Sequence, residues 1–179
     1  RQLGTNCGLV AKHAMAEFDG RTYWMGDSNF YFYSGQVQVL PSTVKRYVFE
    51  DFNFTNRRKV YCGVNSEFGE VTWLYPSANS AECNRYVTYS PSQNYWTFGK
   101  AIWTTWVDKN IIDTVITTGV SITAPNTSTD LNFLYDNEPP NTHTADGQDM
   151  PSFIESGEFD LGDGDDILFI DRIIPDVRV

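Results

Sequence analysis

Four short segments rich in aromatic and β-branched residues follow one another between residues 59 and 103, and they constrain the fold more than any other feature. In the second segment, Val71, Trp73 and Tyr75 fall on one face of a strand and the residues between them on the other. The linkers are rich in Pro, Ser, Asn and Gly and are too short for the crossovers that parallel strands need. We therefore predict one antiparallel four-stranded meander, which matches a β-propeller blade. The segments span residues 59–64, 70–75, 85–90 and 95–103.

Similar patterns on both sides of this meander predict further strands. Two aromatic runs, at residues 21–26 and 29–35, are separated by two polar residues and predict a hairpin. Residues 113–118 and 131–135 predict later strands, and we assign all of these to neighbouring blades. The expected fold class is all-β and propeller-like, built from antiparallel four-stranded meander blades with one short helix. Because a propeller normally needs about four blades or more, the chain is expected to hold only part of one.

The one predicted helix is amphipathic and about three turns long. It follows residues 41–43, whose Pro, Ser and Thr offer an N-terminal cap. Its apolar stripe has to be buried against a sheet or a neighbouring subunit, while its charged side chains stay exposed. The apolar stripe consists of Val44, Val48, Phe49 and Phe52. The residues expected to be exposed are Lys45, Arg46 and Glu50.

Charge divides the chain unevenly. A length of 179 residues predicts a single domain over residues 1–179, with aromatic-rich blades at 8–123 and an acidic part at 124–179. Residues 130–179 carry 2 basic and 13 acidic side chains, a net charge of −11, and the whole chain carries −10. This balance disfavours a protein that holds nucleic acid through its phosphates.

The acidic part is predicted to contain a loop, residues 137–151, and a closing hairpin formed by residues 152–161 and 167–174. The carboxylates of the hairpin turn are expected to be solvated. Calcium binding is the alternative, although the spacing is not that of an EF-hand and the single β-roll-like repeat has no stacked copy with which to share an ion. The residues concerned are Asp160, Asp163, Asp165 and Asp166.

No combination of residues predicts catalysis, and we assign no catalytic, cofactor-binding or metal-binding residue. A Ser–His–Asp triad could use only His13 or His143, and the sequence has no nucleophile elbow. Paired carboxylates for glycoside hydrolysis occur in any acidic β-protein, so a glycoside hydrolase on a propeller is one alternative function. The candidate carboxylates are Glu50, Asp51, Glu67 and Glu70.

The aromatic residues, 15% of the chain, are expected to fill the space between sheets. A carbohydrate- or receptor-binding module that uses exposed Trp and Tyr is the second alternative function. Of the three cysteines, Cys62 and Cys83 are expected to be buried free thiols, with a disulfide between them as the alternative. No run approaches 18 apolar residues, so no membrane span is expected, and the first ten residues resemble a cut end rather than a signal segment.

An ordered series of motifs from residue 8 to residue 178 resembles the tail hub or nozzle proteins of short-tailed bacteriophages, also called packaged-DNA stabilisation proteins. No single motif is diagnostic, and the resemblance depends on their succession. The motifs are YWMG (23–26), FYSGQV (32–37), VLPS (39–42), YVFED (47–51), GVNSEFGEVTWLYP (63–76), NRYV (84–87), WTFG (96–99), IESG (154–157), DLGDGD (160–165) and RIIPD (172–176).

The resemblance implies a virion structural protein with a β-propeller body, made in the host cytoplasm and located in the tail. It implies a homo-oligomeric ring, typically of six copies, that contacts other tail proteins such as an adaptor or a tail needle or fibre. Such a ring forms part of the conduit that retains and ejects the viral DNA, and it brings no catalytic residues. Members of the family are much longer than this chain, which would be a fragment of one. In this setting the four aspartates at 160–166 are expected to face the channel, where like charge keeps passing DNA from binding.

Overall fold

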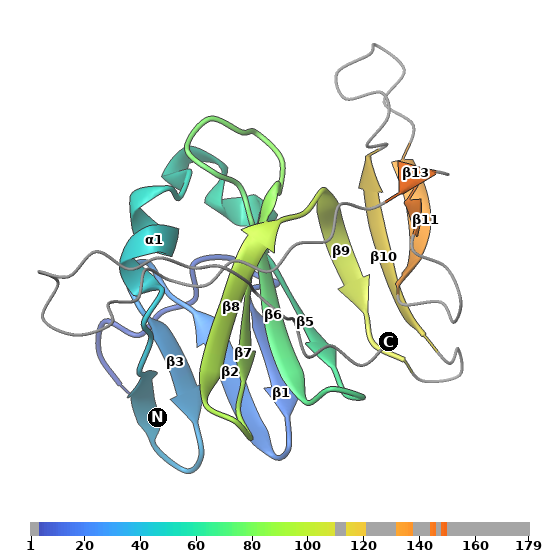
Figure 1. Ribbon diagram of the computed structural model, residues 1–179. Helices are drawn as coiled ribbons and strands as arrows, with labels where there is room; N and C mark the ends of the chain where they lie inside the picture. The colour runs from blue at the N-terminus through green and yellow to red at the C-terminus, as the bar shows by residue number, and fades with distance from the viewer. Residues whose placement is uncertain (1–3, 110–113, 121–131, 138–143, 146–147, 150–179) are drawn as a thin grey trace, which may run out of the picture.

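A computed structural model describes residues 4–109, 114–120, 132–137, 144–145 and 148–149 (Figure 1). Across these ranges the fold is predominantly β, with antiparallel sheets of three or four strands and no closed barrel. The predicted all-β class is confirmed at this level. The predicted strands at 152–161 and 167–174 lie outside the described residues, as do Asp160, Asp163, Asp165 and Asp166.

The first sheet is a four-stranded antiparallel meander near the N-terminus. The predicted hairpin is confirmed as its two central strands, and the two outer strands were not predicted. The turn between the first two strands consists of Asp19 and Gly20, which both have positive φ, and Phe18 pairs with Arg21 across it. Asp-Gly in a two-residue turn is a strong hairpin signal. The strands are β1 (Met15–Phe18), β2 (Arg21–Met25), β3 (Phe30–Tyr33) and β4 (Val37–Leu40).

The second sheet is the predicted meander, and its antiparallel pairing is confirmed throughout. It ends at Lys100 rather than at Trp103, because the chain leaves the sheet at Ala101 and starts a new one. Its strands are β5 (Tyr61–Asn65), β6 (Glu70–Tyr75), β7 (Arg85–Ser90) and β8 (Tyr95–Lys100).

The third sheet has the order β11-β10-β9 and confirms the two strands predicted after residue 112. It consists of β9 (Trp103–Val107), β10 (Val115–Val120) and β11 (Asn132–Asn137). A small hairpin, β12 (Thr144–Ala145) and β13 (Gln148–Asp149), lies in the segment that the sequence predicted as loop. The sequence did not predict this hairpin, because each of its strands has only two residues and the surrounding segment is polar.

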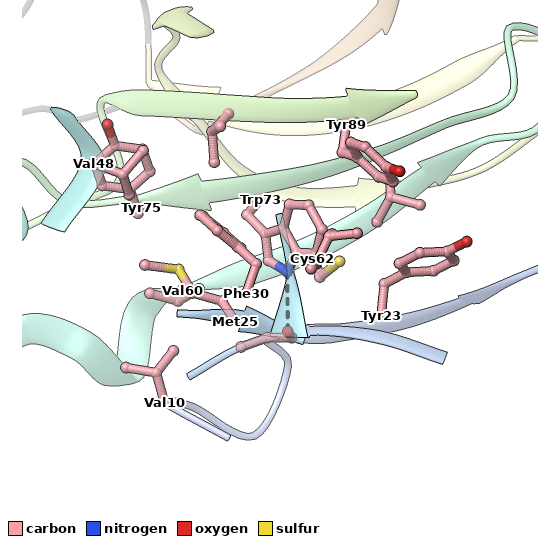
Figure 2. Packing of buried hydrophobic residues seen from close by; sticks show 14 of the residues in the cluster. Val10, Tyr23, Met25, Phe30, Val48, Val60, Cys62, Trp73, Tyr75 and Tyr89 are labelled. Atoms are coloured by element: carbon pink, nitrogen blue, oxygen red, sulfur yellow. Dashed lines mark hydrogen bonds between the residues drawn. The ribbon is translucent and has the colours of Figure 1, made fainter. Parts of the chain in front are cut away.

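The first two sheets pack face to face and enclose the hydrophobic core (Figure 2). Trp73 is fully buried at its centre, with its ring centroid 5.0 Å from that of Phe30 and 6.0 Å from that of Trp96. Its indole Nε1 donates a hydrogen bond to the Ala14 carbonyl, at 3.1 Å, and so links the two sheets. The predicted alternation along β6 is confirmed, and Val71, Trp73 and Tyr75 face the core. Its opposite face is buried as well, because β9 of the third sheet packs beside β5 and β6.

Helix α1 (Lys45–Glu50) follows β4 and is shorter than predicted. It ends early because Phe52 forms a bridge with Ser77 and the Asn53 amide donates to the Pro76 carbonyl, at 3.0 Å. The predicted cap is wrong, since the N-cap residue is Val44 and no side chain caps the helix. A 3-10 helix, η1 (Phe54–Lys59), follows and is capped by the Asn53 side chain.

The predicted exposure pattern of α1 holds with one exception. Val44, Val48 and Phe52 are buried, but Phe49 is only half-buried at the edge of the core, where its ring meets Phe30. The charged residues of the helix are exposed as expected, namely Lys45, Arg46 and Glu50. None of the helices in the described ranges is both long and apolar enough to cross a membrane.

All three cysteines are free thiols, as predicted for Cys62 and Cys83. Cys62 lies on β5 and faces the core, while Cys83 precedes β7 and its Sγ donates to the Lys59 carbonyl, at 3.2 Å. Burial raises the pKa of both thiols, that of Cys83 to about 12.

Candidate functional site

The first strand of each sheet lies next to the first strand of the following sheet, so β1 contacts β5 and β5 contacts β9. Just before β1, His13 forms a parallel bridge with Tyr61 at the start of β5. The Cys62 amide donates to the His13 carbonyl, at 2.7 Å, and the imidazole stacks on the Tyr61 ring, with 5.5 Å between centroids. The first histidine considered for a triad therefore joins two sheets, and His143 lies outside the described residues.

A tryptophan–glycine contact joins the second and third sheets. Trp106 on β9 packs directly on Gly63 of β5, where even a methyl group would overlap the indole ring. The indole Nε1 donates to the Val64 carbonyl, at 2.7 Å. Glycine is required at this position because the backbone of β5 has to approach the ring closely.

An open hollow of about 610 Å³ lies where these three strands meet. Glu17 and Asp19 line it from the β1–β2 hairpin, and Asp108 lines it from the end of β9. The backbone of β5 and the indole of Trp106 form the rest of its wall. The charged side chains among its lining residues are all acidic, so the hollow repels anions.

Asp108 is fixed in place by the turn that follows β5. Its Oδ1 accepts hydrogen bonds from the amides of Ser66, at 3.1 Å, and Lys109, at 2.9 Å. Glu17 and Asp19 are exposed. Within the described ranges, no group of three or more His, Cys, Asp or Glu side chains is arranged to hold a metal ion.

The carboxylates considered for glycoside hydrolysis each contact a different partner. Glu50 pairs with Arg46 at 2.8 Å, Asp51 with Arg85 at 3.3 Å, and Glu67 with Lys109 at 2.9 Å. Glu70 accepts a hydrogen bond from the Tyr95 hydroxyl, at 3.1 Å. None of the four lines the acid-lined hollow, and Glu50 lines a second hollow of about 500 Å³ beside α1.

Sequence reasoning did not single out the acidic residues that line the first hollow. Glu17, Asp19 and Asp108 come from distant parts of the chain and share no motif. Asp19 alone had a local signal, the Asp-Gly turn.

No protein-family model matches the chain, and a search of curated proteins finds no significant match. The fold therefore defines the class of this protein, an all-β protein of successive antiparallel sheets, and its function has to be argued from the arrangement described above.

Proposed function

We propose that this chain is a structural part of a bacteriophage tail hub or nozzle, in which it forms part of a ring-shaped conduit for viral DNA. The observation that carries the proposal is the junction of β1, β5 and β9 around an acid-lined hollow. The ordered motifs described above supply the link to the phage family.

The junction supports a propeller-like body. In a β-propeller the blades are four-stranded meanders arranged radially around a central channel, so one strand of each blade lies nearest the axis. The first two sheets here are such meanders, and the first strand of each sheet adjoins that of the next. Read this way, the three sheets are successive blades, and further chain or neighbouring copies complete the ring.

The acidic lining suits a conduit better than a binding site. DNA slides past a wall of like charge, because the attraction that drives binding to phosphate is reversed. Glu17, Asp19 and Asp108 provide such a lining, and the aspartates at 160–166 are proposed to extend it. The partners of such a ring are its own copies, an adaptor, and a needle or fibre protein of the tail.

A charge-reversal experiment tests this proposal. Virions that carry Glu17→Lys are expected to release DNA more slowly, and the delay should shrink at high salt because the screening length falls from about 8–10 Å at physiological salt to about 3 Å at 1 M. Glu50→Lys makes a similar charge change on exposed α1 and is the control. Reversal of Asp160, Asp163, Asp165 and Asp166 should act in the same direction. Release at the normal rate by both sets of variants at every salt concentration would contradict the conduit.

A further inference from the structure

The face of the first sheet that is turned away from the core carries an unbroken row of apolar side chains. Tyr23 and Met25 of β2 lie in the core, so Trp24 between them faces the opposite side of the sheet. The strand register places one residue from each strand side by side on this outer face, and a sheet face in contact with water normally carries polar side chains instead. The row consists of Met15 on β1, Trp24 on β2, Tyr31 on β3 and Val39 on β4.

An uncharged segment near the N-terminus lies over the middle of this row. The Trp24 indole Nε1 donates to the Cys7 carbonyl, at 2.8 Å, and the Tyr31 hydroxyl donates to the Asn6 carbonyl, at 2.9 Å. These contacts leave the two central rings of the row buried, whereas the residues at its two ends, on β1 and β4, are 43% and 55% exposed. The segment therefore covers the centre of the outer face and leaves both ends open.

The outer face of the third sheet is apolar as well. Trp106 packs on the second sheet, so Val107, the next residue of β9, faces away from it. Ile116 pairs with Val107 on this face, and Leu134 shares the face because it pairs with Thr118, two residues along β10. Val107 is 58% exposed and Leu134 is 75% exposed. In the part of the chain that the structure describes, the series of three sheets thus presents an apolar face at each end.

We propose that the outer face of the first sheet docks on the outer face of the third sheet of a second copy, and that two copies close into a pair through two such contacts. Within the chain, the first sheet packs on the second and the second on the third, so the contact continues the same stacking from one copy to the next. It is a head-to-tail contact, which forms a closed assembly when the rotation between copies brings the remaining faces together.

The number of sheets favours two copies. A β-propeller has about 4–8 blades, so the three sheets of one copy are too few and the sheets of two copies fall within that range. A closed pair makes the docking contact twice, which doubles the apolar area that it removes from water. A second copy also suits these faces better than an unrelated partner, because every copy presents both of the apolar faces that meet.

This proposal rests on the proposed function only in treating the sheets as successive blades, and it involves neither DNA nor other tail proteins. The two can therefore fail separately. A chain that does not associate would overturn the pair, whereas normal DNA release by the charge-reversed virions would overturn the conduit.

Sedimentation velocity of the whole chain tests the contact. The wild type should form a two-copy species as its concentration rises. Val39→Glu on the first sheet and Leu134→Lys on the third should each weaken association by about tenfold or more, because each places an unpaired charge in the contact. Phe68→Lys is the matched control, since Phe68 is 54% exposed in the turn between β5 and β6, and it should associate as the wild type does. Thermal melting should show that all variants fold.

A mixture of the two variants distinguishes the head-to-tail contact from a contact between like faces. A pair made of one Val39→Glu copy and one Leu134→Lys copy has one contact in which both faces are unchanged, and in its other contact the two new charges are opposite. The mixture should therefore recover most of the pairing that each variant loses alone. The proposal is wrong if the wild type sediments as a single copy at every concentration, if only one of the two variants weakens association, or if mixing restores nothing. Species larger than two copies would contradict the closed pair.

Discussion

The two interfaces between sheets differ in the side chains that form them. The first interface joins the first and second sheets, and the second interface joins the second and third sheets. The first buries interlocking aromatic rings, with Trp73 at its centre. The second depends on Trp106 against Gly63, while the third sheet itself is held partly by threonine hydroxyls, such as Thr105 and Thr118 at 2.6 Å. In β11, the outer strand of the third sheet, Leu134 is 75% exposed. Close-packed aromatic surface holds sheets together along their whole faces, whereas a single-ring contact can open locally.

Removal of the central ring should have the largest effect. Trp73→Ala removes a fully buried indole and its hydrogen bond to Ala14, and we expect a loss of about 3–5 kcal/mol in the free energy of unfolding. Urea denaturation followed by fluorescence measures it. Phe68→Ala, at an exposed ring, should change the same quantity by less than about 0.5 kcal/mol. Similar losses for both variants would show that the aromatic core does not dominate stability.

A methyl group at Gly63 should loosen the second interface selectively. Gly63→Ala overlaps the indole of Trp106, and we expect a cost of about 1–3 kcal/mol. Amide hydrogen exchange should become faster in β9 and β10 while β6 and β7 stay protected. In a Trp106→Ala background the same change should cost much less, because the overlapping ring is gone. If Gly63→Ala costs the same free energy of unfolding in both backgrounds, the strain does not come from overlap with the Trp106 ring.

High pH should weaken the first interface through its buried thiol. Burial raises the pKa of Cys62 and Cys83 above the ordinary value of 9.0. Both thiols are therefore neutral in the folded and unfolded states at neutral pH, and their full contribution to stability is present there. Above about pH 9 the unfolded chain loses these protons first, so the free energy of unfolding should fall with a slope that approaches about 1.4 kcal/mol per pH unit for each thiol.

Cysteine variants separate the two contributions. Cys62→Ala and Cys83→Ala should each reduce the slope of unfolding free energy against pH between pH 9 and 10, as measured by urea denaturation across that range. An unchanged slope in both variants would mean that these thiols do not titrate with unfolding. A smaller slope for Cys62→Ala alone would locate the effect in the core between the first two sheets.

The two interfaces also differ in how far the sequence predicted them. Alternation of Val71, Trp73 and Tyr75 between turn-rich linkers was enough to predict the second sheet and which of these side chains share a face. Strands β1 and β4 were missed because they lack the aromatic runs that marked β2 and β3, and their pairing depends on the strands beside them. The contact of Gly63 with Trp106 and the acid-lined hollow join residues from distant parts of the chain. Local periodicity carries no information on such contacts.

Two buried tyrosines of the second sheet test whether the hydroxyl groups in its core are hydrogen-bonded, and these variants should have the smallest effects. The Tyr75 hydroxyl has no hydrogen-bond partner among the described residues, whereas the Tyr89 hydroxyl donates to Asn94 Oδ1, at 3.1 Å. Removal of an unpaired buried hydroxyl relieves its desolvation cost, so Tyr75→Phe should stabilise the protein by about 1 kcal/mol. Tyr89→Phe breaks a hydrogen bond and should destabilise it by about 0.5–1.5 kcal/mol. Thermal and urea unfolding of the two variants should therefore shift in opposite directions, and a loss of stability in Tyr75→Phe would show that its hydroxyl is bonded in solution.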